Sequence, residues 1–478
     1  MSESIWNALY EPLSQVSWND WRGFWQDVAL ADRYLVCYFA PLLLVLRVMP
    51  GRWLRHAIVL TGLAFIAWMF GAAYALFWLA LCVGLYWLGE RFAASVESGK
   101  PPRWRAGVVV AALIGGGYFG GFKLARVALP LELDAWLFHH APWVFPFGVR
   151  GWSCEPDWLR FFAAESGPRL LSCLFARMHV IGLAYLAMRM LPYFSELARG
   201  GIPRHRRTLL NFLAYACYGP NLMQGPIERY NEFHEQIDTC STRRAWRAVA
   251  YAAWRIGLGL FKGLVGTVYL WPTVRDYLNS DLYYEHPERI ESTAFLFFGT
   301  HLQMLWLFLM FSGYCDISVG MSRLLGYHQA ENFRQPWRSS SMRDVWHRWH
   351  ITVSYIARDY LYFPLGGSRQ RATLNLCATF VFIGVWHAPS MNFVAWGVLM
   401  GLLMRVNQLW HAYAKRLAER RDGFMPALRR AWLRLWPLPQ LCAWALTLLT
   451  FLETMRVFFG GSGGWRVPLE LLRRWTSA

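Results

Sequence analysis

Long apolar runs separated by short polar and basic segments dominate this chain of 478 residues. A helix that crosses a bilayer needs roughly 20 mostly apolar residues. Runs of that length, together with slightly shorter ones, predict about ten to twelve membrane-spanning helices. The candidate spans are 33–49, 56–70, 72–89, 106–122, 170–191, 208–223, 247–271, 293–312, 373–387, 392–410 and 440–459. The pattern therefore predicts an all-α, polytopic integral membrane protein.

Two segments depart from this simple pattern. Residues 124–150 are apolar, but Pro130, Pro142 and Pro146 interrupt them. Irregular backbone at membrane depth must be covered by protein or water, so we expect a re-entrant or interfacial segment there. Residues 411–438 are charged and helical in pattern, which fits either a helix along the membrane surface or a solvated connector.

Composition supports a membrane protein. Hydrophobic residues make up 56% of the chain and charged residues 16%, against about a quarter charged in soluble proteins. The 28 tryptophans suit the water–lipid interface. The first 30 residues contain Glu3, Glu11, Asp20 and Asp27, so we expect no cleavable signal peptide and a first span that itself directs insertion.

The formal net charge of +18 comes from short basic clusters between apolar runs. Such clusters hold loops on the cytoplasmic side and contact anionic lipid headgroups, so membrane lipids rather than nucleic acid are the expected partners. The nine cysteines are scattered and include no C-x-x-C pair, so neither a disulfide framework nor a zinc site is implied. The clusters are Arg47, Arg52 and Arg55; Lys100, Arg103 and Arg105; Arg204, Arg206 and Arg207; and residues 415–430.

Ionisable side chains are concentrated between Phe311 and Gly367, in a long polar and aromatic stretch flanked by apolar spans. One ionisable group at mid-membrane costs roughly 2.5–3.5 kcal/mol. This density predicts a water-filled cavity or a cytoplasmic funnel. The ionisable side chains are Asp316, Arg323, Glu331, Arg334, Arg338, Arg343, Asp344, His347, Arg348, His350, Arg358 and Asp359.

Two histidines in or beside this stretch are predicted to converge. One helix is expected to end before Pro364, and a second to run from about Ala372 to 386. His350 lies 13 residues before Phe363, and His387 lies 15 residues after Ala372, or about 20 Å and 22 Å. If the helices are antiparallel, both imidazoles reach nearly the same depth. A neutral imidazole can take the proton of a hydroxyl that attacks a thioester; the alternative is a histidine that only makes a structural hydrogen bond.

Several neighbours are candidate substrate contacts, each with an alternative role. Trp346, Trp349 and Tyr360 either wall a tunnel or anchor the interface. Arg343 and Arg348 either contact donor phosphates or follow the positive-inside rule. Asp359 completes the candidate set. His347 and His350 resemble half of a metal site, but no carboxylate or thiolate cluster completes it, so no metal is expected.

At these residues the sequence resembles the membrane-bound O-acyltransferase family and, within it, the alginate O-acetylase branch. The resemblance covers about 215–400. The matching segments are QGPIERYNEF at 224–233, GLFKG at 259–263, FSGYCDISVGMSRLLGYHQAENF at 311–333, VWHRWHITVSYIARDYLYFPLGG at 345–367, GVWHAPSMNFVAWG at 384–397 and RVFF at 456–459.

The resemblance implies that His387 and His350 are the active-site histidines, beside a tunnel through a thinned membrane centre. It implies O-acetylation of an exported polysaccharide from a cytoplasmic thioester, either acetyl-CoA or an acyl carrier protein, with no bound cofactor. A periplasmic partner of the serine-esterase type completes transfer in that branch, which places the chain in the inner membrane. The P-L-G-G segment at 364–367 fits the acetylating branch better than the related teichoic-acid D-alanyl transferases.

The resemblance also suggests three parts: N-terminal transmembrane helices at 1–200, a catalytic core at 201–410, and a basic surface loop with a further transmembrane helix at 411–478. Ala388, Pro389, Met391, Met400 and His347 depart from the family pattern, so the acceptor and the docking of a partner stay open.

Other functions compete with this interpretation. A non-catalytic transporter or a scaffold subunit of a glycan-export complex would also line a pathway with polar residues. Inverted repeats would favour a transporter, and the sequence contains none that we detect. A D-alanyl or lipid acyltransferase of the same family is the third possibility.

Overall fold

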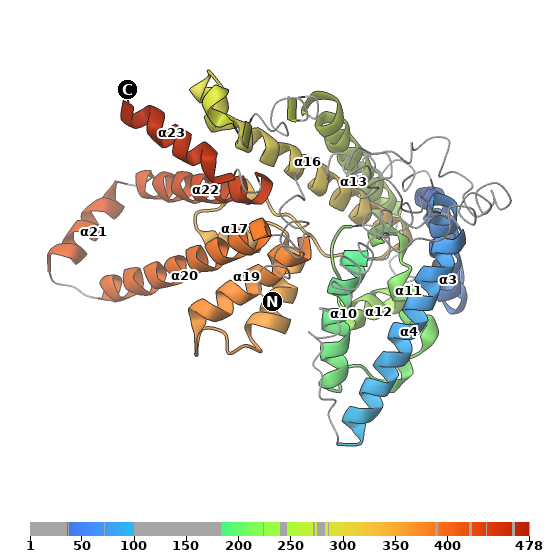
Figure 1. Cartoon of the computed structure of the whole chain (residues 1–478). Coiled ribbons are helices and arrows are strands. Elements are labelled where there is room, and N and C mark those ends of the chain that lie inside the picture. The colour runs from blue at the N-terminus through green and yellow to red at the C-terminus, as the bar shows by residue number, and fades with distance from the viewer. Residues whose placement is uncertain are drawn as a thin grey trace, which may run out of the picture. The chain divides into compact units, whose positions relative to one another are not determined.

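The computed structural model describes residues 36–99, 183–239, 246–274, 283–387, 391–419, 423–460 and 464–477, apart from positions 37, 71, 223, 271–272, 285 and 436. All regular elements in these ranges are helical (Figure 1). Five helices are long and apolar enough to cross a membrane: Ala75–Glu97, Trp246–Leu270, Thr293–Leu325, Asn392–Glu419 and Leu438–Phe459.

These helices confirm an all-α, multi-pass membrane protein. The predicted total of spans stays a prediction, because 106–122 and most of 170–191 lie outside the described residues. The predicted re-entrant segment at 124–150 lies outside them as well.

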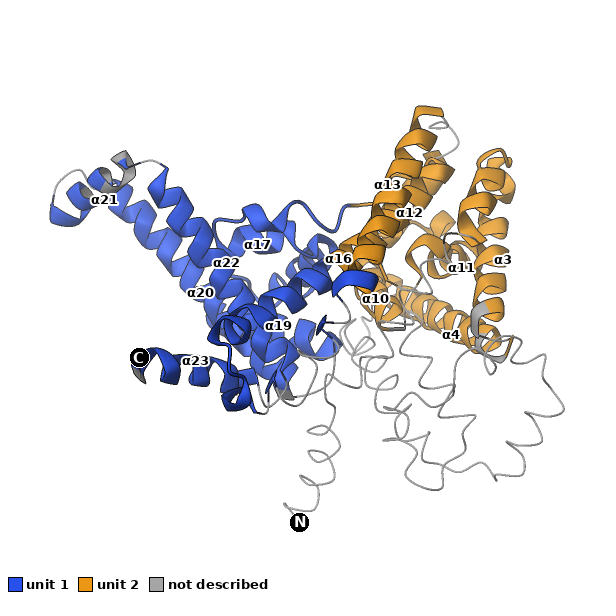
Figure 2. Ribbon diagram, turned by 90° about the horizontal axis from the view of Figure 1, so that it is seen from above, with its two compact units in different colours: residues 1–19, 268–308, 331–478 blue, residues 20–267, 309–330 orange. Residues whose placement is uncertain are grey.

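The chain forms two compact units (Figure 2). Unit 1 takes residues 268–308 and 331–478 together with 1–19, and unit 2 takes residues 20–267 and 309–330. Helix α16 (Thr293–Leu325) therefore contributes to both. The predicted division at residues 200 and 410 stays a prediction.

Unit 2 packs long helices closely through glycine. A methyl group on Gly259 of α13 would overlap the carbonyl oxygen of Gly313 on α16, so the two backbones can approach only because both residues lack side chains. Asp316 bonds Arg255 and Lys262 at 2.6 Å each, which pairs a carboxylate within a spanning helix. The helices of this unit outside α16 are α3 (Gly51–Phe70), α4 (Ala72–Glu97), α10 (Leu183–Ala198), α11 (Leu209–Ala216), α12 (Tyr230–Thr239) and α13 (Trp246–Leu264), the last continued by a π-helical segment (Val265–Leu270).

Helix α11 corrects the span predicted at 208–223. It begins after the N-cap Thr208 and ends at Ala216, only eight residues later. The chain then turns through a 3-10 segment (Gly219–Asn221) with Pro220 at its start. Proline cannot donate the backbone hydrogen bond that would continue the helix. This apolar run is therefore a short buried helix and a turn.

Unit 1 contains residues 331–367 of the polar stretch and the helices around them. Its elements are α17 (Met342–Arg348), α18 (Ile351–Ala357), the π-helical segment η11 (Arg358–Tyr362), α19 (Ala372–His387), α20 (Met391–Glu419), α21 (Phe424–Arg434), α22 (Leu438–Phe459) and α23 (Arg466–Ser477), with short 3-10 turns such as η10 (Pro336–Arg338) and η9 (Pro287–Arg289).

Helices α19 and α20 form an antiparallel pair with close backbones. A methyl group on Gly384, Gly397 or Gly401 would overlap backbone atoms of the other helix, at Phe393, Val381 and Cys377 respectively. Residue numbers fall along α20 as they rise along α19, so the pair places the end of α19 beside the start of α20. Because α20 continues to Glu419 before α21 begins, the segment predicted as one surface element at 411–438 is instead the last turns of α20 followed by α21 (Figure 1).

One buried arginine joins α22 to the start of α16. The Arg456 guanidinium is fully buried and donates to the carbonyl oxygens of Leu296 and Phe297 and to the hydroxyl of Thr300, at 3.2, 2.7 and 3.0 Å. It also pairs with Glu453 one turn earlier. A buried charge needs such compensation, so this residue of the RVFF segment has a clear structural role.

Candidate active site

The helix predicted to end before Pro364 begins only after His350, and the break between it and α17 positions the imidazole. His350 has φ 46° and ψ 51°, a left-handed conformation between α17 and α18. Such a conformation costs a non-glycine residue about 1–3 kcal/mol and persists only where neighbours impose it. Asn332 does so: its carbonyl oxygen accepts the Ile351 N–H at 3.0 Å, and its side chain accepts the Thr352 N–H at 3.2 Å.

The same asparagine sets the tautomer of His350. A backbone N–H can only donate, so the Asn332 atom that faces Thr352 must be the amide oxygen. That oxygen also accepts the Thr352 hydroxyl at 2.9 Å and lies 3.3 Å from His350 Nδ1. His350 Nδ1 must therefore carry the proton to make this hydrogen bond. Its Nε2 then has a lone pair and can accept a proton.

The His350 and His387 rings meet at this position. Their centroids lie 6.4 Å apart at an interplanar angle of 55°. His387 is the last residue of α19, and its ring contacts Trp386, Phe393 and Phe458 with centroid distances of 4.6, 6.3 and 5.4 Å. The predicted convergence of the two imidazoles is confirmed, and the residues between His350 and Phe363 are helical, in part as the π-helical segment η11.

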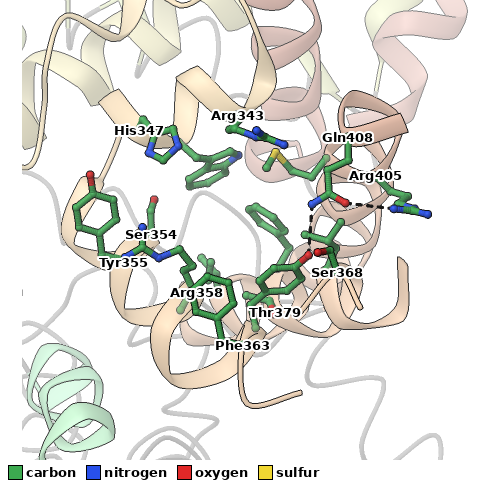
Figure 3. A pocket seen from close by; sticks show the side chains of 17 residues that line it. Arg343, His347, Ser354, Tyr355, Arg358, Phe363, Ser368, Thr379, Arg405 and Gln408 are labelled. Atoms are coloured by element: carbon green, nitrogen blue, oxygen red, sulfur yellow. Dashed lines mark hydrogen bonds between the residues drawn. The ribbon is translucent and has the colours of Figure 1, made fainter. Parts of the chain in front are cut away.

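A cavity of about 520 Å³ lies between α17, α18, α19 and α20 (Figure 3). Its wall is mostly apolar or aromatic, with the cationic side chains of Arg343, Arg358 and Arg405 placed around it. Gln408 links two wall elements, because it donates to the Tyr362 hydroxyl and accepts from Arg405 at 3.3 Å each. The lining residues are Arg343, Trp346, His347, Ser354, Tyr355, Ala357, Arg358, Tyr362, Phe363, Ser368, Leu376, Thr379, Phe380, Ile383, Met404, Arg405 and Gln408.

The cavity stops one helical turn short of both histidines. Ile383 lines it and lies four residues before His387 on α19. Ser354 also lines it, and its hydroxyl donates to the His350 carbonyl oxygen at 3.1 Å. Four helical residues span about 6 Å. The cavity therefore extends from the neighbourhood of Gln408 and Ser368 toward the paired imidazoles.

Comparison with known proteins identifies the family. The sequence profile of the membrane-bound O-acyltransferase family matches residues 170–437, more than half of the chain. The chain belongs to this family. The matched range contains both histidines and every residue of the cavity wall.

Several curated proteins are similar to this chain. The probable alginate O-acetylase of Pseudomonas syringae pathovar tomato is 26% identical over 383 residues, which cover 77% of this chain and 64% of that protein. The peptidoglycan O-acetyltransferase of Helicobacter pylori is 28% identical over 53% of this chain and 44% of its own length. The teichoic acid D-alanyltransferase of Bacillus subtilis is 25% identical over 49% and 60%. The chain thus spans about two thirds, or less, of the relatives named here.

The structure of this member of the family separates the predicted substrate contacts into two groups. Arg343 and Trp346 line the cavity. The other four lie outside its wall. Their roles in substrate binding stay predictions.

Three of those four residues contact a neighbouring side chain, and the fourth is buried. Arg348 bonds Asp344 at 2.8 Å, one turn away as the i,i+4 spacing predicts. Trp349 is buried, with its ring 5.0 Å from that of Phe333. Asp359 pairs at 2.6 Å with Arg358, which itself lines the cavity, and Tyr360 is buried.

Three residues of this site were missed by the sequence analysis. Arg405 and Gln408 lie within an apolar predicted span, and an ionisable residue inside a span is by itself a sign of function. Asn332 is the second-last residue of the GYHQAENF string at 326–333, but its contact with His350 joins residues 18 positions apart, and no periodic pattern reveals it. His347 and His350, which resemble half of a metal site in the sequence, have different surroundings. His347 lines the cavity, whereas His350 faces Asn332 and His387.

Proposed function

We propose that this protein is an O-acyltransferase of the cytoplasmic (inner) membrane that moves an acyl group, most simply acetyl, from a cytoplasmic thioester toward an exported polysaccharide. The observation that carries the proposal is the pair of imidazoles 6.4 Å apart, beyond the end of a mostly apolar cavity whose wall includes three arginines. The names of the relatives, which refer to alginate, peptidoglycan and teichoic acid, support an envelope polymer as acceptor.

The chemistry needs few groups because a thioester is already activated. The acceptor oxygen attacks the thioester carbonyl carbon, its proton passes to His387, the carbon–sulfur bond breaks, and the thiolate leaves with a proton. His350 holds its ring in one tautomer through Asn332, and its Nε2 can carry the proton between acceptor and leaving group. The Trp346 side chain lines the cavity, but its indole N–H is buried and finds no acceptor among the described residues.

The cavity also suggests from which side the donor arrives. Arg405 and Gln408 lie on the part of α20 that leads to Glu419, Lys415 and the basic α21. Basic segments of this kind mark the cytoplasmic side. A donor with phosphate groups, such as acetyl-CoA or a phosphopantetheine-bearing carrier protein, would meet Arg343 and Arg405 first and extend its thioester toward the histidines. A periplasmic partner of the serine-esterase type would then complete transfer to the polymer.

Mass analysis of the exported glycan tests this function. We expect ester-linked acetyl groups in a strain with the protein and their loss in a strain without it, restored by the intact gene. Feeding isotopically labelled acetate identifies the transferred group. Ester-linked alanine in place of acetate would assign the protein to the D-alanyl branch, and an unchanged glycan would contradict the proposal.

Neutralising the cavity arginines should weaken donor binding. For Arg343→Gln and Arg405→Gln we expect a KM for the donor raised about tenfold each with little change in kcat, because a charge-assisted hydrogen bond contributes roughly 1.5–3 kcal/mol. Steady-state kinetics in membrane vesicles measures both constants. Arg338→Gln is the matched control, since Arg338 is exposed and outside the cavity. An unchanged KM in both cavity variants would remove the donor from this cavity.

A further inference from the structure

Along the chain, an amphipathic helix precedes α22 and another follows it. Its 22 residues span about 33 Å, close to the roughly 30 Å of a bilayer hydrocarbon core. Helix α21 ends at Arg434, just before α22 begins at Leu438. Helix α23 begins at Arg466, and residues 460–465, which reach about 20 Å at most, separate it from α22. If α22 crosses the bilayer, α21 and α23 lie near opposite membrane surfaces.

One face of α23 holds the helix on unit 1. Val467 and Leu471 are buried, and Glu470 bonds Arg474 at 2.7 Å. Arg474 in turn donates to the carbonyl oxygen of Ile290 at 2.6 Å, three residues before α16 begins. The start of α16 and the end of α22 thus both lie close to α23, which fixes this helix where two spanning helices reach the same surface.

The opposite face of α23, together with Trp465 just before the helix begins, is apolar and is left uncovered by the part of the chain that the structure describes. Trp465, Leu469, Leu472 and Trp475 are 49%, 65%, 57% and 61% exposed. Spacings of four, three and three residues place them on one stripe of the helix. Four large apolar side chains in a row would be unfavourable in water, at roughly 25 cal/mol for each Å² of apolar surface.

This stripe continues into the surface of a spanning helix. The Trp475 ring lies 6.1 Å from the Phe297 ring of α16, and the adjacent Phe298 is 60% exposed. Arg466 and Arg473 flank the stripe on one side, where lipid phosphates would meet them. Apolar residues, terminal tryptophans and flanking cations are the combination that places a helix in the plane of a bilayer interface.

We propose that α23 is an interfacial helix whose stripe Trp465–Leu469–Leu472–Trp475 inserts into the headgroup–acyl boundary of the leaflet away from the cytoplasm. The other end of α22, its N-terminus, follows α21 and the basic segment before it. That segment contains Lys415, Arg416, Arg420 and Arg421, which assigns the N-terminal end of α22 to the cytoplasmic side. The ligand of α23 is therefore the bilayer itself. This inference stands independently of the acyltransferase activity.

Photocrosslinking in native membranes tests the occupant of the stripe. A benzophenone amino acid is placed at Leu472 of the full-length protein and, as the control, at Glu288 of η9, which is exposed beside α23. We expect phospholipid adducts at Leu472, at least fivefold more abundant than at Glu288. A protein adduct at Leu472, or equal lipid capture at both positions, would overturn the proposal. Leu469 provides a second position if the Leu472 variant fails to accumulate.

Cysteine accessibility tests the sidedness. In a Cys442→Ser background, Arg473→Cys and Lys415→Cys are labelled with a membrane-impermeant maleimide in right-side-out and inside-out vesicles, with the background protein as reference. We expect Arg473→Cys to react at least fivefold more in right-side-out vesicles and Lys415→Cys at least fivefold more in inside-out vesicles. Labelling of both positions from one side would contradict the opposite placement of α21 and α23.

Discussion

Acyl transfer by the His387→Ala variant is expected to fall by about 10² to 10⁴-fold, the range that general-base help supplies. The imidazole is the last residue of α19 and lies 6.4 Å from the His350 ring, so its loss removes the group that we assign as the proton acceptor. Donor binding should change little, because His387 lies outside the cavity wall. Glycan acetylation in cells and single-turnover transfer in vesicles measure the effect at matched protein levels.

Two further variants separate catalysis from packing. His387→Gln keeps hydrogen-bonding groups but cannot hold a proton at neutral pH, so it should be as inactive as the alanine variant. His411→Ala alters an exposed histidine near the far end of α20 and should retain full activity. Substantial activity in His387→Gln would mean that the ring only makes a structural hydrogen bond, and our assignment would then be wrong.

The sequence pattern predicts those helices and helix ends that local residue types determine. The end of the helical stretch before Pro364 and the Asp344–Arg348 pair follow from residue type and spacing. Apolar runs likewise predict α16, α20 and α22. The run at 208–223 misleads, because apolar composition alone does not distinguish a spanning helix from a buried turn around Pro220.

The sequence predicts the two histidines of the candidate site but not the contacts that position them. Counting residues brings His350 and His387 to one depth, but the left-handed junction at His350 depends on Asn332, which is distant in sequence. Trp349 and Tyr360 look like tunnel walls because aromatic residues suit both a tunnel and a core. Tertiary packing decides which side of each helix faces the cavity. In this structure it buries Trp349 and Tyr360, and neither residue lines the cavity.

The second large effect is expected for Asn332→Leu, which should lower kcat about 10²-fold while the donor KM stays within about twofold. Leucine approximates the size of asparagine but cannot accept the proton of His350 Nδ1, so the tautomer of His350 is no longer fixed. The Thr352 N–H also loses its acceptor, at a cost of about 1–3 kcal/mol in folding free energy. Thermal unfolding in detergent measures that loss separately from kcat.

Matched changes at the same cluster decide whether the tautomer or the fold is responsible. Asn332→Asp keeps an oxygen that accepts from His350 and Thr352, so it should retain most of the activity that leucine removes. Thr352→Val deletes the hydroxyl that donates to Asn332 at 2.9 Å but leaves the His350 contact in place, so kcat should stay near normal even where stability falls. If Thr352→Val lowers kcat as much as Asn332→Leu does, the cluster acts by holding the backbone turn, and control of the His350 proton is not its function.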